Sequence, residues 1–131
     1  MTETVSDKIY NQLSECMCEP HESKGRIYAK FSFPTTFAGF KGHFPDNPVV
    51  PGICIIQAGM LICEKWYKRN THLKEILYAK FFSPVRPEML IRFECIKISQ
   101  KQDNHIIKIR VAGTKAPKVA EFKLRINSKK K

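Results

Sequence analysis

The sequence predicts an α+β fold in which a curved antiparallel sheet of five or six strands wraps one long buried helix. Two observations predict this fold. Residues 52–69 are apolar on nearly every helical face, which is typical of a helix buried on most sides. Four strand-like runs follow, and the last three alternate apolar and polar residues. Because 131 residues suit one domain, we expect a single domain over residues 1–131.

The segments ahead of the helix are less uniform, and residues 1–25 are expected to be a variable N-terminal segment. Residues 7–18 carry apolar side chains four positions apart, which favours a helix but leaves a strand open. Residues 19–25 have the composition of a turn or loop. Residues 26–33 alternate as in a half-buried strand, and residues 34–51 form a loop with four of the eight prolines.

The segments after the helix predict an antiparallel run of strands. Turn-forming residues separate the runs, and the terminal segment 128–131 is expected to be a solvated basic tail. Four phenylalanines on predicted strands are expected to pack against the helix: Phe31, Phe33, Phe81 and Phe82. The predicted strands after the helix are residues 74–84, 90–100, 104–113 and 119–127.

The charge is strongly positive and unevenly placed. The formal net charge is +11, yet residues 1–22 hold five acids against one lysine. Residues 97–131 hold eleven bases against two acids. A basic surface of this size predicts an acidic partner, which could be a nucleic acid, an anionic lipid or an acidic protein. We expect no nucleic-acid binding, because the chain shows no recognisable nucleic-acid-binding module.

The sequence predicts a cytoplasmic protein. Its first residues lack the basic and apolar regions of a signal peptide, and its longest apolar stretch is too short and polar to span a bilayer. Five cysteines without framework spacing indicate free thiols in a reducing compartment. Cys16, Cys18 and His21 lack a suitably spaced fourth ligand, so no metal site is expected.

The segment from residue 42 to residue 58 carries the chemistry. His43 stands in a loop stiffened by prolines at positions 45, 48 and 51. Gly52 begins the predicted helix, so its backbone N–H lacks a helical partner and can bind an oxygen that carries negative charge. Gln57 is a polar residue among the apolar residues of that helix. Together these groups form a candidate active site.

One motif runs from His43 through Phe44 and Pro45 to Gly52, with prolines at positions 48 and 51. It resembles the 3-hydroxyacyl-acyl-carrier-protein dehydratases of fatty-acid synthesis. Residues 80–87 resemble the strand-to-turn segment of that family, and residues 119–122 resemble its last strand. The resemblance covers roughly residues 26–127.

The resemblance implies a hot-dog fold and a homodimer, or a trimer of dimers, whose sheets join edge to edge. It implies a substrate carried on the phosphopantetheine of acyl-carrier protein, and no further cofactor. His43 matches the catalytic histidine, and Gly52, flanked by Pro51 and Ile53, matches the glycine that polarises the thioester carbonyl. In the family, an acidic residue on the helix of the other subunit completes the site, and that position is Gln57 here.

Glutamine at this position leaves three interpretations open, because an amide cannot act as a general acid. The protein could be a dehydratase with an altered catalytic pair, making trans-2-enoyl thioesters for fatty-acid, polyene or specialised lipid synthesis. It could instead be an acyl-thioesterase, or a non-catalytic partner that binds acyl-carrier protein. Glu64 is a poor substitute, because the seven residues after Gln57 add about 10 Å of helix rise.

The acidic partner implied by the resemblance is acyl-carrier protein, which would need a basic docking surface. Arg86 lies in the segment that resembles the strand-to-turn segment of the family. Lys65, Lys68 and Arg69 lie at the end of the predicted helix. We therefore expect carrier-protein docking at these four residues.

Overall fold

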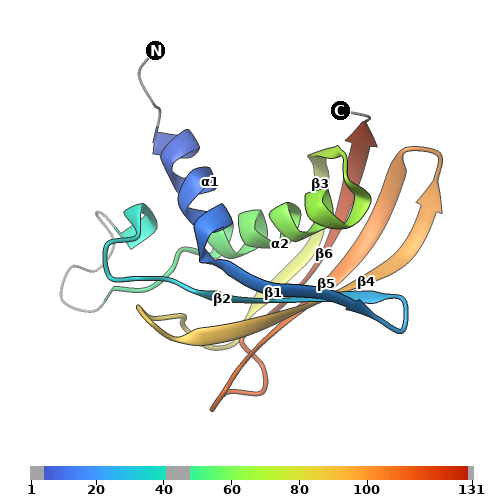
Figure 1. Ribbon diagram of the computed structural model, residues 1–131. Helices are drawn as coiled ribbons and strands as arrows, with labels where there is room; N and C mark the ends of the chain where they lie inside the picture. The colour runs from blue at the N-terminus through green and yellow to red at the C-terminus, as the bar shows by residue number, and fades with distance from the viewer. Residues whose placement is uncertain (1–4, 41–47, 130–131) are drawn as a thin grey trace.

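The computed structural model describes residues 5–40 and 48–129. These residues form two α-helices and one six-stranded antiparallel sheet (Figure 1). The elements in chain order are α1 (Val5–Cys16), β1 (Met17–Ser23), β2 (Arg26–Ser32), the short 3-10 helix η1 (Ala38–Phe40), α2 (Gly52–Tyr67), β3 (Asn70–Phe81), β4 (Leu90–Lys101), β5 (Asn104–Gly113) and β6 (Ala120–Lys129).

The sheet has the strand order β1-β2-β4-β5-β6-β3, which leaves β1 and β3 as its two edges. Every neighbouring pair is antiparallel. Figure 1 shows α2 lying across one face of the curved sheet, with α1 beside it. The predicted α+β class, the single long buried helix and the strand count are confirmed.

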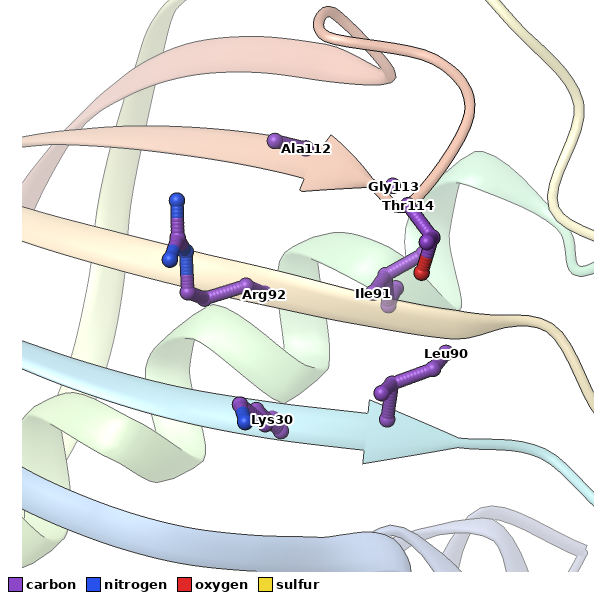
Figure 2. Close-up of a pocket in the computed structure, with 7 residues that line it drawn as sticks. All are labelled: Lys30, Leu90, Ile91, Arg92, Ala112, Gly113 and Thr114. Atoms are coloured by element: carbon purple, nitrogen blue, oxygen red, sulfur yellow. The ribbon is translucent and has the colours of Figure 1, made fainter.

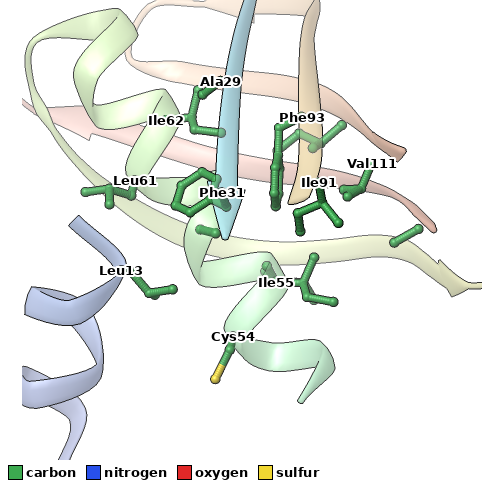
Figure 3. Packing of buried hydrophobic residues seen from close by; sticks show 14 of the residues in the cluster. Leu13, Ala29, Phe31, Cys54, Ile55, Leu61, Ile62, Ile91, Phe93 and Val111 are labelled. Atoms are coloured by element: carbon green, nitrogen blue, oxygen red, sulfur yellow. The ribbon is translucent and has the colours of Figure 1, made fainter. Parts of the chain in front are cut away.

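Helix α2 packs unusually close to the sheet at Gly59. A Cβ atom there would lie 2.8 Å from Ile109 Cδ1 on β5 and 3.1 Å from Cε2 of Phe122 on β6. The absence of a side chain therefore lets the helix backbone approach the strands. Figure 3 shows the resulting core, in which apolar side chains of α2 meet those of β2, β4 and β5.

Helix α1 covers another side of α2. Leu13 is fully buried against the core (Figure 3), and the Tyr10 hydroxyl donates a hydrogen bond of 2.6 Å to a Glu64 carboxylate oxygen. This bond, with partial burial and the Glu64 charge, raises the pKa of Tyr10 to about 12. Glu64 also accepts a hydrogen bond from Thr71 at 3.5 Å, so its carboxylate joins α1, α2 and β3.

The prediction of a loop over residues 19–25 was wrong, because β1 continues to Ser23. The turn shrinks to Lys24 and Gly25, which have φ angles of 52° and 77°, as a tight two-residue hairpin requires. Strand β1 is an edge strand, and all its residues after Met17 are exposed. An edge strand tolerates Pro20 and an irregular register, which here falls between Cys18 and His21.

The expectation that four phenylalanines pack in the core holds for only two of them. Phe31 and Phe33 are fully buried, whereas Phe81 and Phe82 are 48% and 51% exposed. Phe81 ends β3, the edge strand, and Phe82 follows it, so neither has a neighbouring strand to cover it on the open side.

The thiols agree with the expectation of free cysteines. Cys54, Cys63 and Cys95 are buried and unpaired, Cys16 is half-buried, and Cys18 is exposed. Across the described residues, no helix is both long enough and apolar enough to cross a bilayer.

One end of the core is polar. His105 on β5 is 2% exposed, and its Nε2 lies 2.7 Å from the hydroxyl of fully buried Ser128, in a hydrogen bond. Its ring also packs against Tyr67 at the end of α2, with ring centroids 4.2 Å apart. Burial, and then the nearby charges of Lys97 and Arg69, lower the pKa of His105, against a smaller opposing effect of Asp103.

We therefore expect the folded protein to lose stability as the pH falls below about 6.5, the ordinary pKa of histidine. In that range the unfolded chain binds a proton at His105 that the folded chain does not yet bind, which favours unfolding. Urea unfolding between pH 7.5 and 5 should show a weaker pH dependence for His105→Gln than for the wild type. His72→Gln is the control, because His72 is exposed. If the two variants showed the same pH dependence of the unfolding free energy, His105 would not be the group responsible for the loss of stability.

Candidate active site at the start of helix α2

The sequence places His43 in the candidate site, but this residue lies outside the residues that the structure describes. The described part of the site is built by the start of α2 and by the segment that follows β3. Val50 N–H donates a hydrogen bond of 2.7 Å to the carbonyl of Val85, which ties these two segments together. The family-like segments therefore meet at one place in the fold, although they are 35 residues apart in sequence.

A pocket of about 430 Å³ lies where these segments meet. Gly52 and Ile55 line it from α2, and Phe81 lines it from the end of β3. The remaining lining residues come from the two connecting segments: Val49, Val50, Phe82, Ser83, Pro84 and Val85. The lining is mostly apolar, which suits the carbon chain of a substrate more than a free polar metabolite.

Among the described residues, the start of α2 has a free backbone donor at Gly52, a residue that lines this pocket. Cys54 and Ile55 donate hydrogen bonds of 2.9 and 3.4 Å to the carbonyl of Pro51, which is how the helix begins. Within the described chain, the N–H of Gly52 donates to no backbone carbonyl outside the helix. A helix N-terminus carries partial positive charge, so this N–H can stabilise a carbonyl oxygen on which negative charge develops.

Phe81 shields Gly52. A Cβ atom at position 52 would lie 2.8 Å from Cζ of the Phe81 ring, so only glycine allows this packing without a shift of the ring. Sequence reasoning assigned Phe81 and Phe82 to the core and missed them as pocket residues. The signal that could have found them is their place at the end of a strand, just ahead of the segment that resembles a family turn.

Gln57 does not line this pocket. It lies five residues after Gly52, about 7–8 Å along the helix. Its side chain is half-buried, and it forms no hydrogen bond with any other residue that the structure describes. Ile53, on the same uncovered face of α2, is 55% exposed and also lies outside the pocket lining. The described chain therefore presents Gly52 and Gln57 on different surfaces.

The four expected docking residues separate into two groups. Arg86 is exposed next to Val85, which lines the pocket. Lys65, the nearest of the other three to Gly52, follows it by thirteen residues, about 20 Å along α2. Arg69 forms an ion pair of 3.1 Å with Asp103 at that far end. The helix-end bases are therefore distant from the pocket.

A family model described as ApeI-like, the ApeI dehydratase, matches residues 19–123. Among curated proteins, a 3-hydroxyacyl-[acyl-carrier-protein] dehydratase FabZ from Caulobacter vibrioides is 36% identical over 93 residues. The FabZ from Lactobacillus helveticus is 35% identical over 88 residues. The matches cover 63% and 62% of this chain, and the chain spans 58% of the length of each relative.

Solved structures support the hot-dog fold. The dehydratase heterocomplex ApeI:P from Xenorhabdus doucetiae matches with a TM-score of 0.71 at 17% identity, covering 85% of this chain and 96% of that one. A hypothetical thioesterase with coenzyme A from Streptococcus pneumoniae also has a TM-score of 0.71, at 7% identity, with 98% of both chains covered. The family model spans most of the chain, including the start of α2 and the pocket lining, so this protein belongs to the ApeI-like dehydratase family.

Proposed function

We propose that this protein is a lyase that dehydrates 3-hydroxyacyl thioesters of acyl-carrier protein to trans-2-enoyl thioesters. The observation that carries the proposal is the apolar pocket at the start of α2, where the Gly52 N–H has no backbone partner outside the helix within the described chain. The match to dehydratases supports the same reaction. We place the reaction in the cytoplasm, in fatty-acid, polyene or specialised lipid synthesis.

The proposed reaction needs one base, one acid and one stabiliser of negative charge. His43 removes a proton from C2 of the substrate while the Gly52 N–H stabilises the charge on the thioester oxygen. The C2–C3 double bond forms as the C3–O bond breaks. His43 returns its proton to the leaving hydroxyl, which departs as water, and the Gln57 amide of a second copy of the chain orients that hydroxyl by hydrogen bonding. No metal or redox cofactor takes part in this scheme.

A substrate assay tests the proposal. Purified protein is incubated with 3-hydroxyacyl-, enoyl- and saturated acyl-carrier protein, and the products are identified by mass spectrometry. We expect enoyl product from the 3-hydroxyacyl substrate, and loss of that product in His43→Ala. Release of free acid from the saturated substrate would instead identify a thioesterase and contradict the proposal.

The proposed site includes a second subunit at the edge of β3. Among the described strands, β3 pairs with β6 alone, and it is twelve residues long with its other edge open. Exposed apolar side chains accompany that edge on β3 and on the start of α2: Leu73, Ile76, Phe81 and Ile53. A long apolar edge with unpaired backbone groups favours pairing with another chain. A second copy there would bring the uncovered Gln57 face of α2 against its partner.

Lysine in place of Ile76 should weaken this dimer by at least about tenfold in dissociation constant, because it puts a charge into an apolar contact. Light scattering across a dilution series should give twice the single-chain mass for the wild type and a lower mass for Ile76→Lys. Ile98→Lys is the matched control, since Ile98 is 48% exposed on β4 rather than on the open edge. A monomeric wild type would contradict the proposed dimer.

A second candidate function is that of a subunit in a heterocomplex. Two observations favour it: glutamine stands at position 57, where the family has an acid, and one structural relative is the dehydratase heterocomplex ApeI:P. In this case the partner subunit supplies the carboxylic acid that Gln57 cannot replace. No turnover by the purified protein, with retained binding of acyl-carrier protein, would favour this candidate.

A further inference from the structure

The face of the sheet turned away from α2 contains an extended hollow. One part, of about 610 Å³, crosses the outer sides of β2, β4, β5 and β6. A second part, of about 290 Å³, adjoins it, and Arg92 and Ala112 line both. Figure 2 shows the second part with α2 behind the strands. We call the two parts together the outer groove.

One row of side chains across the outer groove consists of charged residues that are ion-paired to one another. Glu94 on β4, Arg110 on β5 and Glu121 on β6 lie directly opposite one another in register. The Arg110 guanidinium lies 3.9 Å from a Glu94 oxygen and 3.6 Å from a Glu121 oxygen. Hydroxyl groups of Tyr28 and Tyr78 donate to these two carboxylates at 3.0 and 2.7 Å. The acidic residues of the groove are therefore already occupied.

The next row places two positive charges opposite each other. Lys30 on β2 lies directly opposite Arg92 on β4, and like charges in this arrangement destabilise a sheet. Lys30 has a partner, because its Nζ lies 2.9 Å from a Glu19 oxygen. Arg92 is exposed and has no carboxylate within ion-pair distance among the described residues. Glu19 compensates the charge of Lys30, so Arg92 is the unpaired positive charge of this row in the described chain, and an acidic partner would stabilise it.

Lys118 extends the same positive surface toward the pocket. It is exposed, and within the described chain it has no acidic partner. Its Nζ lies 5.8 Å from the centre of the Phe82 ring. The segment that carries Lys118 is fixed to the segment after β3, since Phe82 N–H donates to the Val119 carbonyl at 2.8 Å and the Ser83 hydroxyl donates to the Lys118 carbonyl at 3.3 Å.

Phe82 connects the outer groove to the candidate active site. Its side chain lines both the outer groove and the pocket that contains Gly52. A partner bound on Arg92 and Lys118 would therefore lie beside that pocket. Lys65, by contrast, lies about 20 Å along α2 from Gly52.

We propose that the outer groove is the docking surface for the acidic carrier protein, with Arg92 and Lys118 as its main contacts. This inference rests on the proposed function, because it takes acyl-carrier protein as the partner. It moves the docking surface away from Lys65, Lys68 and Arg69. Charge complementarity selects the occupant, since the unpaired charges of the outer groove are positive.

Two double variants with the same charge change test this inference. Arg92→Glu with Lys118→Glu alters the outer groove, and Lys65→Glu with Lys68→Glu alters the end of α2. Titration with holo-acyl-carrier protein at low salt should show binding at least about tenfold weaker for the outer-groove variant and little change for the control. The wild-type affinity should fall as salt rises, and this dependence should be smaller in the outer-groove variant.

Kinetics separates docking from chemistry. The ratio of kcat/KM for carrier-bound substrate to kcat/KM for the pantetheine thioester should fall at least about tenfold in the outer-groove variant. Equal effects of the two double variants, or no effect of either, would overturn the docking surface. A change in oligomeric mass with unchanged carrier affinity would also overturn it, and would assign the groove to a contact between copies. A wild type that turns over neither substrate would instead refute the proposed function, while the titration still tests docking.

Discussion

Replacement of Gln57 with glutamate should raise the rate of 3-hydroxyacyl dehydration by about 10²–10⁴-fold, the usual contribution of a general acid. The new carboxyl group can protonate the leaving hydroxyl, which the amide cannot do. The side chain at position 57 is half-buried and has no hydrogen-bond partner in the described chain, so glutamate breaks no existing hydrogen bond. Single-turnover measurements with 3-hydroxyacyl-acyl-carrier protein would give the change in the chemical step.

Gln102→Glu is the matched control for this prediction. Gln102 is exposed in the turn between β4 and β5, so the same chemical change there should leave the dehydration rate as it is in the wild type. An unchanged rate in Gln57→Glu would contradict the assignment of position 57 to the missing acid. If Gln57→Glu instead released more free fatty acid and gave no enoyl product, the dehydration chemistry itself would be contradicted.

Phe122→Ala should lower the free energy of unfolding by about 3–5 kcal/mol, the usual cost of deleting a buried aromatic ring. Phe122 is fully buried on β6, and its ring packs directly on the α2 backbone at Gly59. The helix cannot move far into the resulting cavity, because Ile109 also supports it there. A loss of this size is a large share of the stability of a typical domain. Urea unfolding at pH 7.5 would measure it.

Phe82→Ala is the comparison for that experiment. Phe82 is half-exposed, so we expect its loss to cost within about 0.5 kcal/mol, as for surface substitutions in general. Equal destabilisation by the two variants would contradict the placement of the core between α2 and β6. Comparing Phe122→Ala with Phe82→Ala therefore tests the packing of α2 on the sheet, independently of any activity.

The central strands and α2 could be predicted because their sequences show which side chains are buried. Apolar residues alternate along the strands, and they cover nearly every face of α2. Residues 104–113 form β5 within the predicted limits, since every second side chain faces the helix. Strand β1 could not be predicted in the same way. It is an edge strand without a buried face, so its sequence has no apolar alternation, and Pro20 suggested a loop.

The sequence could indicate residues of the candidate site only where a short local motif marks them. Gly52 lines a pocket, and it could be singled out because a glycine after proline at the start of an apolar helix has a clear sequence signature. Arg92 and Phe82 had no such signature, since their roles depend on strand neighbours far away in the sequence. His105 was detectable in principle, because it occupies an inward position of the alternating pattern that Ile107 continues.

Deuterium incorporation tests the central claim most directly, namely that His43 moves a proton at C2 of an acyl thioester. The protein is incubated with enoyl-acyl-carrier protein in D₂O, so that the reaction runs in the hydration direction. We predict a 3-hydroxyacyl product with one deuterium at C2 for the wild type, and no such product for His43→Ala. Equal incorporation by both proteins, or free acid as the sole product of the wild type, would contradict the assignment.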